Sequence, residues 1–191
     1  FKDLIACQKK CIEIRQSILG EYHENIAQLY YELGRLFFRY SLWNEAELAF
    51  QKAIEIRAKA IGDLNEEIAE TYWSLGVAQS NNGRLSMGLE NLLISKKIYE
   101  DIHGENHESV ALSYVSIGLA QKSILNEELA IENLEKGIKI YTSLYGEGYD
   151  FVIKIRKHLA LIYHSKQMYS KALSYALANL KILFRVNNPN L

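Results

Sequence analysis

A repeat of 42 residues constrains the fold of this chain more than any other feature. Four glycines stand at this spacing along the sequence, at positions 20, 62, 104 and 146. The residues around these glycines repeat in the same register, and the register does not slip. A fixed period of this length is typical of an array of one structural unit, in which each unit packs mainly on its neighbours. We therefore expect a repeat architecture, without a single core built around a unique site.

Each unit has the pattern of two helices. In the first unit, apolar residues fall at spacings of three and four within residues 26–37, and again within residues 46–54. This spacing is typical of helices that bury one face. A short polar segment at residues 39–42 separates the two stretches, so we expect an antiparallel helical hairpin. No segment with the period of a strand competes with this interpretation.

The repeated glycine is expected to end the second helix of each unit. Glycine adopts the left-handed conformation just past a helix end without steric cost. The next helix then begins within a few residues. Its first turn carries an acidic residue, which suits the positive end of the helix dipole. These acidic residues are Glu24, Glu66, Glu108 and Asp150.

The repeated positions resemble the tetratricopeptide repeat (TPR). The first unit fits that pattern throughout, with Tyr30, Leu33, Gly34, Phe37, Ala46, Phe50 and Ala53. The period is longer than the usual period of about 34 residues, and the linkers at residues 20–23 and 104–107 are similar to those of the kinesin light chain subclass. That subclass carries an Asn-Asn pair in the first helix. Here the pairs are Tyr31-Glu32, Trp73-Ser74, Val115-Ser116 and Lys157-His158.

The resemblance implies an all-α fold, a right-handed α-α superhelix (TPR solenoid) of four helical hairpins plus one N-terminal orphan helix. We expect a single TPR array over residues 1–191. Residues 1–19 are expected to be the second helix of a truncated repeat, residues 20–61, 62–103, 104–145 and 146–187 to be repeats 1 to 4, and residues 188–191 to start a further linker. Repeat 4 is expected to be the least stable, because Arg156, Ala176 and Asn179 replace an aromatic, a large apolar and a small residue.

Composition and charge argue against nucleic-acid binding, membrane insertion and a disulfide-rich fold. The net charge is −1, which argues against a general nucleic-acid binder. No apolar run approaches the length of a membrane span. Two cysteines make no disulfide framework, which favours a reducing compartment and hence the cytoplasm.

Candidate chemical groups favour structural roles. Cys7 and Cys11 are in register with Ala49 and Ala53, so both are expected to be small packing residues. His103 and His107 have metal-ligand spacing, but Gly104 interrupts them. The phosphate-loop, hydrolase-elbow and zinc-protease motifs are absent. We therefore expect no enzyme activity, no cofactor and no metal.

The resemblance also implies that the first helices line a concave groove. Tyr31, Phe38 and Trp73 are expected to face solvent there and to anchor a partner, while Arg35 and Arg39 would favour acidic residues in it. Alternatively, neighbouring turns or a terminal helix of a longer chain cover this strip. The predicted groove residues are Gln28, Tyr31, Arg35, Phe38, Arg39, Glu70, Trp73, Val77, Asn81, Leu112, Val115, Leu119, Lys122, Lys154, Lys157, Leu161 and His164.

The function expected from this pattern is that of a protein–protein interaction scaffold or adaptor. It would bind a partner peptide or helix along the groove, as a monomer or with end-to-end self-association, and would use neither nucleic acid nor membrane. The alternative is a regulatory or sensor TPR module of a larger enzyme or signalling ATPase whose catalytic domain lies outside these residues. A helical-repeat RNA binder is disfavoured, because the groove positions show no repeated polar pair that could read bases.

Overall fold

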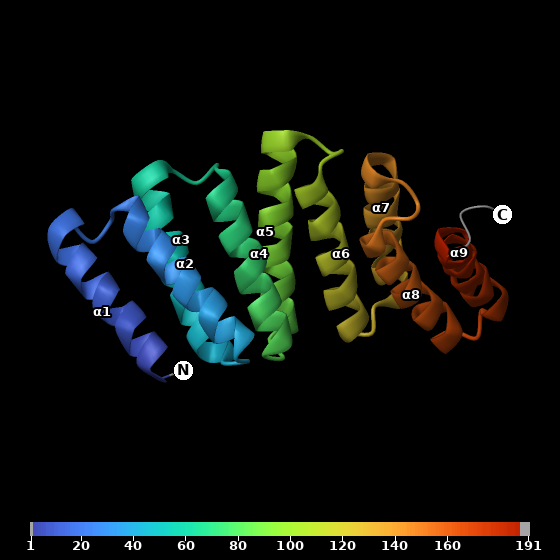
Figure 1. The fold of residues 1–191 in the computed structure, drawn as a ribbon, viewed down its shortest axis with the longest axis horizontal. Coiled ribbons are helices and arrows are strands. Elements are labelled where there is room, and N and C mark those ends of the chain that lie inside the picture. The colour runs from blue at the N-terminus through green and yellow to red at the C-terminus, as the bar shows by residue number, and fades with distance from the viewer. Residues whose placement is uncertain (1, 188–191) are drawn as a thin grey trace. The chain divides into compact units, whose positions relative to one another are not determined.

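The computed structural model describes residues 2–187 and folds them into nine α-helices, with no strand in that range (Figure 1). The helices are α1 (Lys2–Leu19), α2 (Glu24–Arg39), α3 (Trp43–Ile61), α4 (Glu66–Asn81), α5 (Leu85–His103), α6 (Glu108–Ser123), α7 (Glu127–Tyr145), α8 (Asp150–Ser165) and α9 (Tyr169–Asn187). The prediction of an all-α helical repeat is confirmed. The expected linker at residues 188–191 lies outside the described residues.

The helices group into two compact units, Phe1–Gly104 and Glu105–Leu191. The first unit holds the hairpins α2–α3 and α4–α5, with α1 packed on α2 and α3 packed on α4. The second unit holds the hairpins α6–α7 and α8–α9, with α7 packed on α8. The single array over residues 1–191 and its right-handed superhelix stay predictions.

Close helix contact explains the small residue at the centre of each first helix. A Cβ atom on Gly34 would lie 2.6 Å from Cε1 of Phe50 on the facing helix. The same crowding occurs between Gly76 and Leu92, and between Gly118 and Leu134, where the distance to Cγ would be 2.8 Å. Glycine therefore lets the two helices of a hairpin approach, and the large residue opposite fills the space.

Each unit has its own apolar core. The core of the first unit includes Ile12, Ile26, Leu33, Phe50, Ile56 and Leu75. The core of the second unit includes Leu134, Tyr141, Val152, Ile155, Leu159 and Ile162. These residues lie at the helical spacings that the sequence pattern predicted.

Glycine ends the second helices as expected, and side chains that were not predicted as caps begin two of the first helices. Gly62 ends α3 with a φ of 84°, a left-handed conformation that favours glycine. At the helix starts, Nδ1 of His23 accepts a hydrogen bond from the Asn25 amide at 3.1 Å, and Oδ1 of Asn65 accepts one from the Ile68 amide at 2.8 Å. These capping bonds satisfy amides that have no partner inside the helix.

One packing prediction is wrong. Cys7 is exposed on α1, and Cys11 is partly buried against the core of the first unit. Their register equivalents Ala49 and Ala53 are buried, because α2 covers that face of α3. Within the described residues no helix precedes α1, so the face that carries Cys7 stays open.

The fourth hairpin departs most from the others. Arg156 stands where the first three hairpins have tyrosine, and it is buried; its guanidinium donates to the Glu147 carbonyl oxygen at 3.4 Å and lies 3.6 Å from the Glu147 carboxylate. On α9, no side chain described over residues 169–184 is fully buried. Its leucines, such as Leu173 and Leu180, are exposed. The expected low stability of this hairpin stays a prediction.

Candidate partner-binding groove

A recess of about 470 Å³ lies in the first unit between α2 and α4. The lining residues of each helix lie three or four positions apart or next to one another, so those of α2 share one helix face and those of α4 share another. The recess brings together most of the groove residues predicted on these two helices. Its lining consists of Tyr31, Arg35, Phe38, Arg39, Phe50, Glu70, Trp73, Ser74 and Val77.

Tyr31 forms the floor of this recess and does not face solvent. Its side chain is only 4% exposed, with the ring against Phe50 at a centroid distance of 5.8 Å. Its hydroxyl donates to Oε1 of Glu70 at 2.7 Å. Burial raises the pKa of Tyr31 to about 12, and the hydrogen bond to Glu70 adds to the shift. The expectation that Tyr31 is a solvent-facing anchor is therefore wrong, because the neighbouring hairpin covers it.

Apolar side chains form the walls of the recess. Phe38, Trp73 and Val77 are partly buried, so each keeps some surface open. Phe38 packs edge-on against Trp43 at a centroid distance of 5.1 Å, which holds its ring in place. The walls thus offer rigid apolar area to a group that enters the recess.

Charged side chains surround the opening. Arg35 and Arg39 are exposed and stand one turn apart on α2, and Glu70 is exposed on α4. The Arg35 guanidinium lies 5.8 Å from the centroid of the Tyr31 ring. The rim therefore combines two cations with one anion.

A buried arginine under the floor was not anticipated. Arg57 of α3 is 2% exposed, and its guanidinium lies 5.1 Å from the Tyr31 ring centroid. It donates to the carbonyl oxygen of Glu67 at 2.8 Å, to Oγ1 of Thr71, and to Oε1 of Gln28 at 2.6 Å. Gln28 is itself exposed; its side-chain oxygen serves Arg57, and it does not belong to the recess lining.

Nearby carboxylates partly offset the cost of burying the Arg57 charge. Burial lowers its pKa, while the carboxylates of Glu67 and Glu70 act in the opposite direction. The sequence held one signal for this residue, because its register position is also occupied by the buried Tyr99 and Tyr141. An arginine at a position where the next two repeats bury a tyrosine indicates an internal hydrogen-bond network.

In the second unit, the predicted groove residues of α6 are more deeply placed than expected. Val115 is 6% exposed, and its Cγ2 would lie 2.6 Å from a Cβ atom on Gly137. Because Gly137 lets α7 approach α6, Val115 is wedged between the helices and is not solvent-facing. Leu112 and Leu119 are partly buried against the same core, and Lys122 is partly buried.

The predicted residues of α8 are exposed. The Lys154 ammonium lies 5.3 Å from the Phe151 ring centroid, and His164 packs edge-on against Tyr169 at 5.5 Å. Lys157 and Leu161 are open to solvent. Burial, with Lys122 and Lys157 nearby, lowers the pKa of His158. In the first unit, Asn81 is exposed beyond the recess lining and donates to the Val77 carbonyl oxygen at 2.8 Å.

His103 and His107, which have the spacing of metal ligands in the sequence, have structural partners. Nε2 of His103 lies 3.4 Å from Oε1 of Glu66, and Nδ1 of His107 accepts from the Ser109 amide at 3.3 Å to cap α6. Among the described residues no group of three or more potential ligands could hold a metal ion. The expected absence of a metal, cofactor and catalytic activity stays a prediction.

A search of the described helices for membrane spans finds none that is both long and apolar enough.

Comparison with known proteins supports the repeat assignment. A family model described as tetratricopeptide repeat matches residues 1–59. A putative kinesin light chain of Podosopora anserina, with nearly identical TPR-like repeats, superposes with a TM-score of 0.82 at 17% identity, over 97% of this chain and 88% of its own. The chain has the tetratricopeptide-repeat fold.

Other solved structures share this TPR fold. BtubC (BKLC) from P. vanneervenii gives a TM-score of 0.79 at 17% identity, over 85% of this chain. This chain spans 65% of the length of that structure. MamA gives a TM-score of 0.70 at 20% identity, over 96% of this chain and 89% of its own. No curated protein matches the sequence.

Proposed function

We propose that the TPR chain is a protein–protein interaction scaffold that binds a segment of a partner protein in the recess between α2 and α4. The observation that carries this proposal is the combination of partly open aromatic walls and two exposed arginines around one recess. Apolar area with an aromatic anchor and a charged rim is typical of binding hot spots. TPR folds suit this role, because a stack of hairpins presents an extended surface.

The chemistry of the recess favours a partner segment with a large apolar side chain. Burial of such a side chain against Phe38, Trp73 and Val77 contributes about 1.5–3 kcal/mol. Acidic residues of the partner would lie beside Arg35 and Arg39, where they affect orientation and association rate more than affinity. The scaffold would bind without chemistry of its own, with Tyr31 and Arg57 holding the floor rigid. The predicted residues on α6 and α8 stay further candidates on the second unit.

Peptides selected from a random displayed library against the wild-type chain provide the test. We expect them to share a large apolar residue near an acidic one. The Trp73→Ala substitution should weaken their binding by about 2 kcal/mol or more, measured by calorimetry. The exposed Leu64 lies outside the recess, so Leu64→Ala serves as the matched control and should leave binding unchanged.

Two outcomes would contradict the proposal. If Trp73→Ala binds the selected peptides as tightly as wild type, the recess is not the binding site. If Trp73→Ala removes helical circular dichroism, Trp73 serves the fold of α4 and not a partner. Arg35→Ala and Arg39→Ala should weaken binding mainly at low salt, because exposed charges are screened as ionic strength rises.

A further inference from the structure

A second recess lies in the second unit and uses none of the predicted groove residues. Its volume is about 440 Å³. It is formed by the linker that precedes α6, by one side chain of α6, and by α7. Its lining consists of Glu105, Asn106, Tyr114, Lys136, Lys139, Ile140 and Ser143. The combination of a tyrosine, an isoleucine and two lysines suggests a ligand with both apolar and anionic parts.

In the first hairpin, a tyrosine stands at the position that corresponds to Asn106 of this recess. Two periods before Asn106 stands Tyr22, and the Lys59 ammonium lies 3.9 Å from its ring centroid. Lys52 reaches the same ring at 6.0 Å, and its Nζ lies 3.0 Å from Oε1 of Glu21. An ammonium group over an aromatic face is attractive, because the face carries negative charge density. The first hairpin thus shows how an aromatic ring occupies this place.

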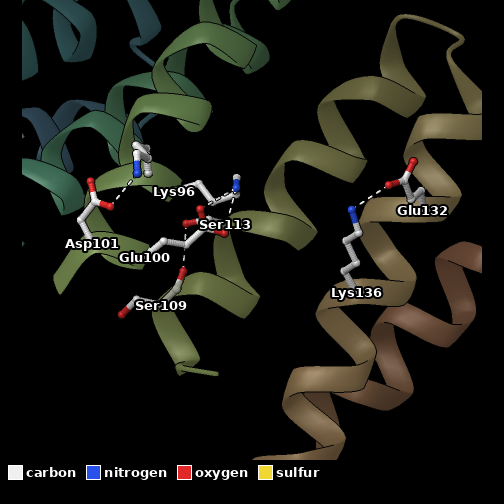
Figure 2. A network of polar contacts seen from close by, with 8 residues as sticks. Lys96, Glu100, Asp101, Ser109, Ser113, Glu132 and Lys136 are labelled. Atoms are coloured by element: carbon white, nitrogen blue, oxygen red, sulfur yellow. Dashed lines mark hydrogen bonds and ion pairs between the residues drawn. The ribbon is translucent and has the colours of Figure 1, made fainter. Parts of the chain in front are cut away.

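In the third repeat that ring is missing. Asn106 replaces Tyr22, while Glu105 and Lys136 keep the charges of Glu21 and Lys52. Lys136 lies 5.6 Å from the Tyr114 ring centroid and pairs with Glu132 at 2.7 Å (Figure 2). The recess therefore keeps its aromatic floor and one ammonium group beside the space that a tyrosine occupies in the first hairpin.

Lys139 lacks the carboxylate partner that Lys97, its equivalent one period earlier, has on α5. One period earlier, Lys97 pairs with Asp101 at 2.6 Å on α5. Ser143 replaces that aspartate. Glu135, one turn before Lys139, accepts hydrogen bonds from the hydroxyls of Tyr163 at 3.2 Å and Tyr175 at 2.9 Å. Over the part of the chain that the structure describes, Lys139 is exposed and has no ion pair.

We propose that this recess binds an acidic–aromatic segment of a partner protein. The aromatic side chain of the partner enters beside Asn106, packs on Tyr114 and Ile140, and lies beside the Lys136 ammonium group, as Tyr22 lies beside that of Lys52 in the first hairpin. A carboxylate adjacent to that ring pairs with Lys139. The site is separate from the recess between α2 and α4, and it stands or fails independently of that proposal.

The test uses the capped peptide Gly-Ser-Glu-Tyr-Ser-Gly as the probe, titrated into the isotope-labelled chain and followed by amide chemical shifts. We expect shifts at Asn106, Tyr114, Lys139 and Ser143. Replacing tyrosine by alanine in the peptide should remove binding, and replacing glutamate by glutamine should weaken it by about two- to fivefold. Lys139→Gln should weaken the unchanged peptide by a similar factor.

The decisive variant is Asn106→Tyr, which should fill the recess from within and abolish peptide binding. It is expected to fold, because Tyr22 occupies the same linker position in the first hairpin. Asn106→Ser is the matched control and should bind as wild type. Trp73→Ala should also bind as wild type, which separates this site from the first recess.

Three results would overturn the proposal. Undiminished binding to Asn106→Tyr would show that the peptide does not enter the recess. Shifts centred on Trp73 and lost in Trp73→Ala would place the peptide in the first recess. Concentration-dependent shifts at Asn106 and Lys139 without peptide would show that a second copy of this chain is the occupant.

Discussion

At the scale of single residues, Arg57 is a charged side chain that lies almost fully buried in the first unit. A fully buried guanidinium must have its donors satisfied, or the free energy of burial is strongly unfavourable. The two terminal nitrogens of Arg57 donate to groups of α2 and α4, while its Nε has no hydrogen-bond partner, so one side chain of α3 joins three helices. The arginine also supports the Tyr31 ring, and through it the floor of the first recess.

We expect Arg57→Ala to lower the free energy of unfolding by about 3 kcal/mol, because it leaves a cavity and buried oxygens without donors. Urea denaturation followed by circular dichroism measures this. Arg15 is the register equivalent on α1, where it is exposed. Arg15→Ala should change stability by no more than about 0.5 kcal/mol. Equal effects of the two substitutions would contradict the role that we assign to Arg57.

At the scale of elements, each of the first three hairpins depends on a glycine that faces a large residue. Gly34 faces Phe50, and the next two hairpins pair glycine with leucine. In the fourth hairpin both members of the pair are alanine, Ala160 and Ala176. The two facing positions therefore change together along the chain. Where the large residue is replaced by alanine, the facing residue is alanine and not glycine.

This pairing predicts non-additive substitutions. Gly34→Ala alone should destabilise the chain by about 1–3 kcal/mol, because the new methyl group overpacks against the Phe50 ring. In a Phe50→Ala background the same change should cost much less, since the clash is gone. A double-mutant cycle of unfolding free energies measures the coupling. Purely additive effects would show that Gly34 is not needed for helix approach.

At the scale of the whole molecule, buried tyrosines in both units make stability sensitive to alkaline pH. Burial raises the pKa of Tyr31 from 10.0 to about 12, and it raises the pKa of Tyr99 and Tyr141 in the same direction. An unfolded tyrosine loses its proton near pH 10, while the folded one retains it. The unfolded state therefore binds fewer protons above that pH, and stability falls as pH rises.

We expect the free energy of unfolding to be unaffected by these groups below pH 10.0 and to decrease toward pH 12, with urea midpoints as the measurement. Surface lysines such as Lys52 act in the same direction, because ion pairs with Glu21 and Glu55 raise its pKa. Tyr31→Phe should reduce the slope, since it removes one titrating group. A stability that is constant or rises over this range would contradict the burial of these tyrosines.

The sequence by itself determined the hairpins, their caps and the helix face that carries the first recess. Helix periodicity and the left-handed Gly62 are local features, set by residues a few positions apart; the caps that His23 and Asn65 provide are equally local, although they were not predicted. The resemblance to the tetratricopeptide repeat implied that Arg35, Arg39 and Trp73 share one groove, and all three line the first recess. A repeat with a fixed period places equivalent faces side by side, so local pattern was sufficient there.

Only the tertiary structure decided which residues of that face remain open. Tyr31 and Val115 share one register position with Trp73, and both are buried while Trp73 is partly open. Exposure depends on how closely the facing helices approach, which Phe50 and Gly137 set from other elements. The network of Arg57 and the recess at Asn106 likewise depend on side chains that meet only after the hairpins have packed. Periodicity determines the direction of a side chain, but its burial is determined by groups that are distant along the chain.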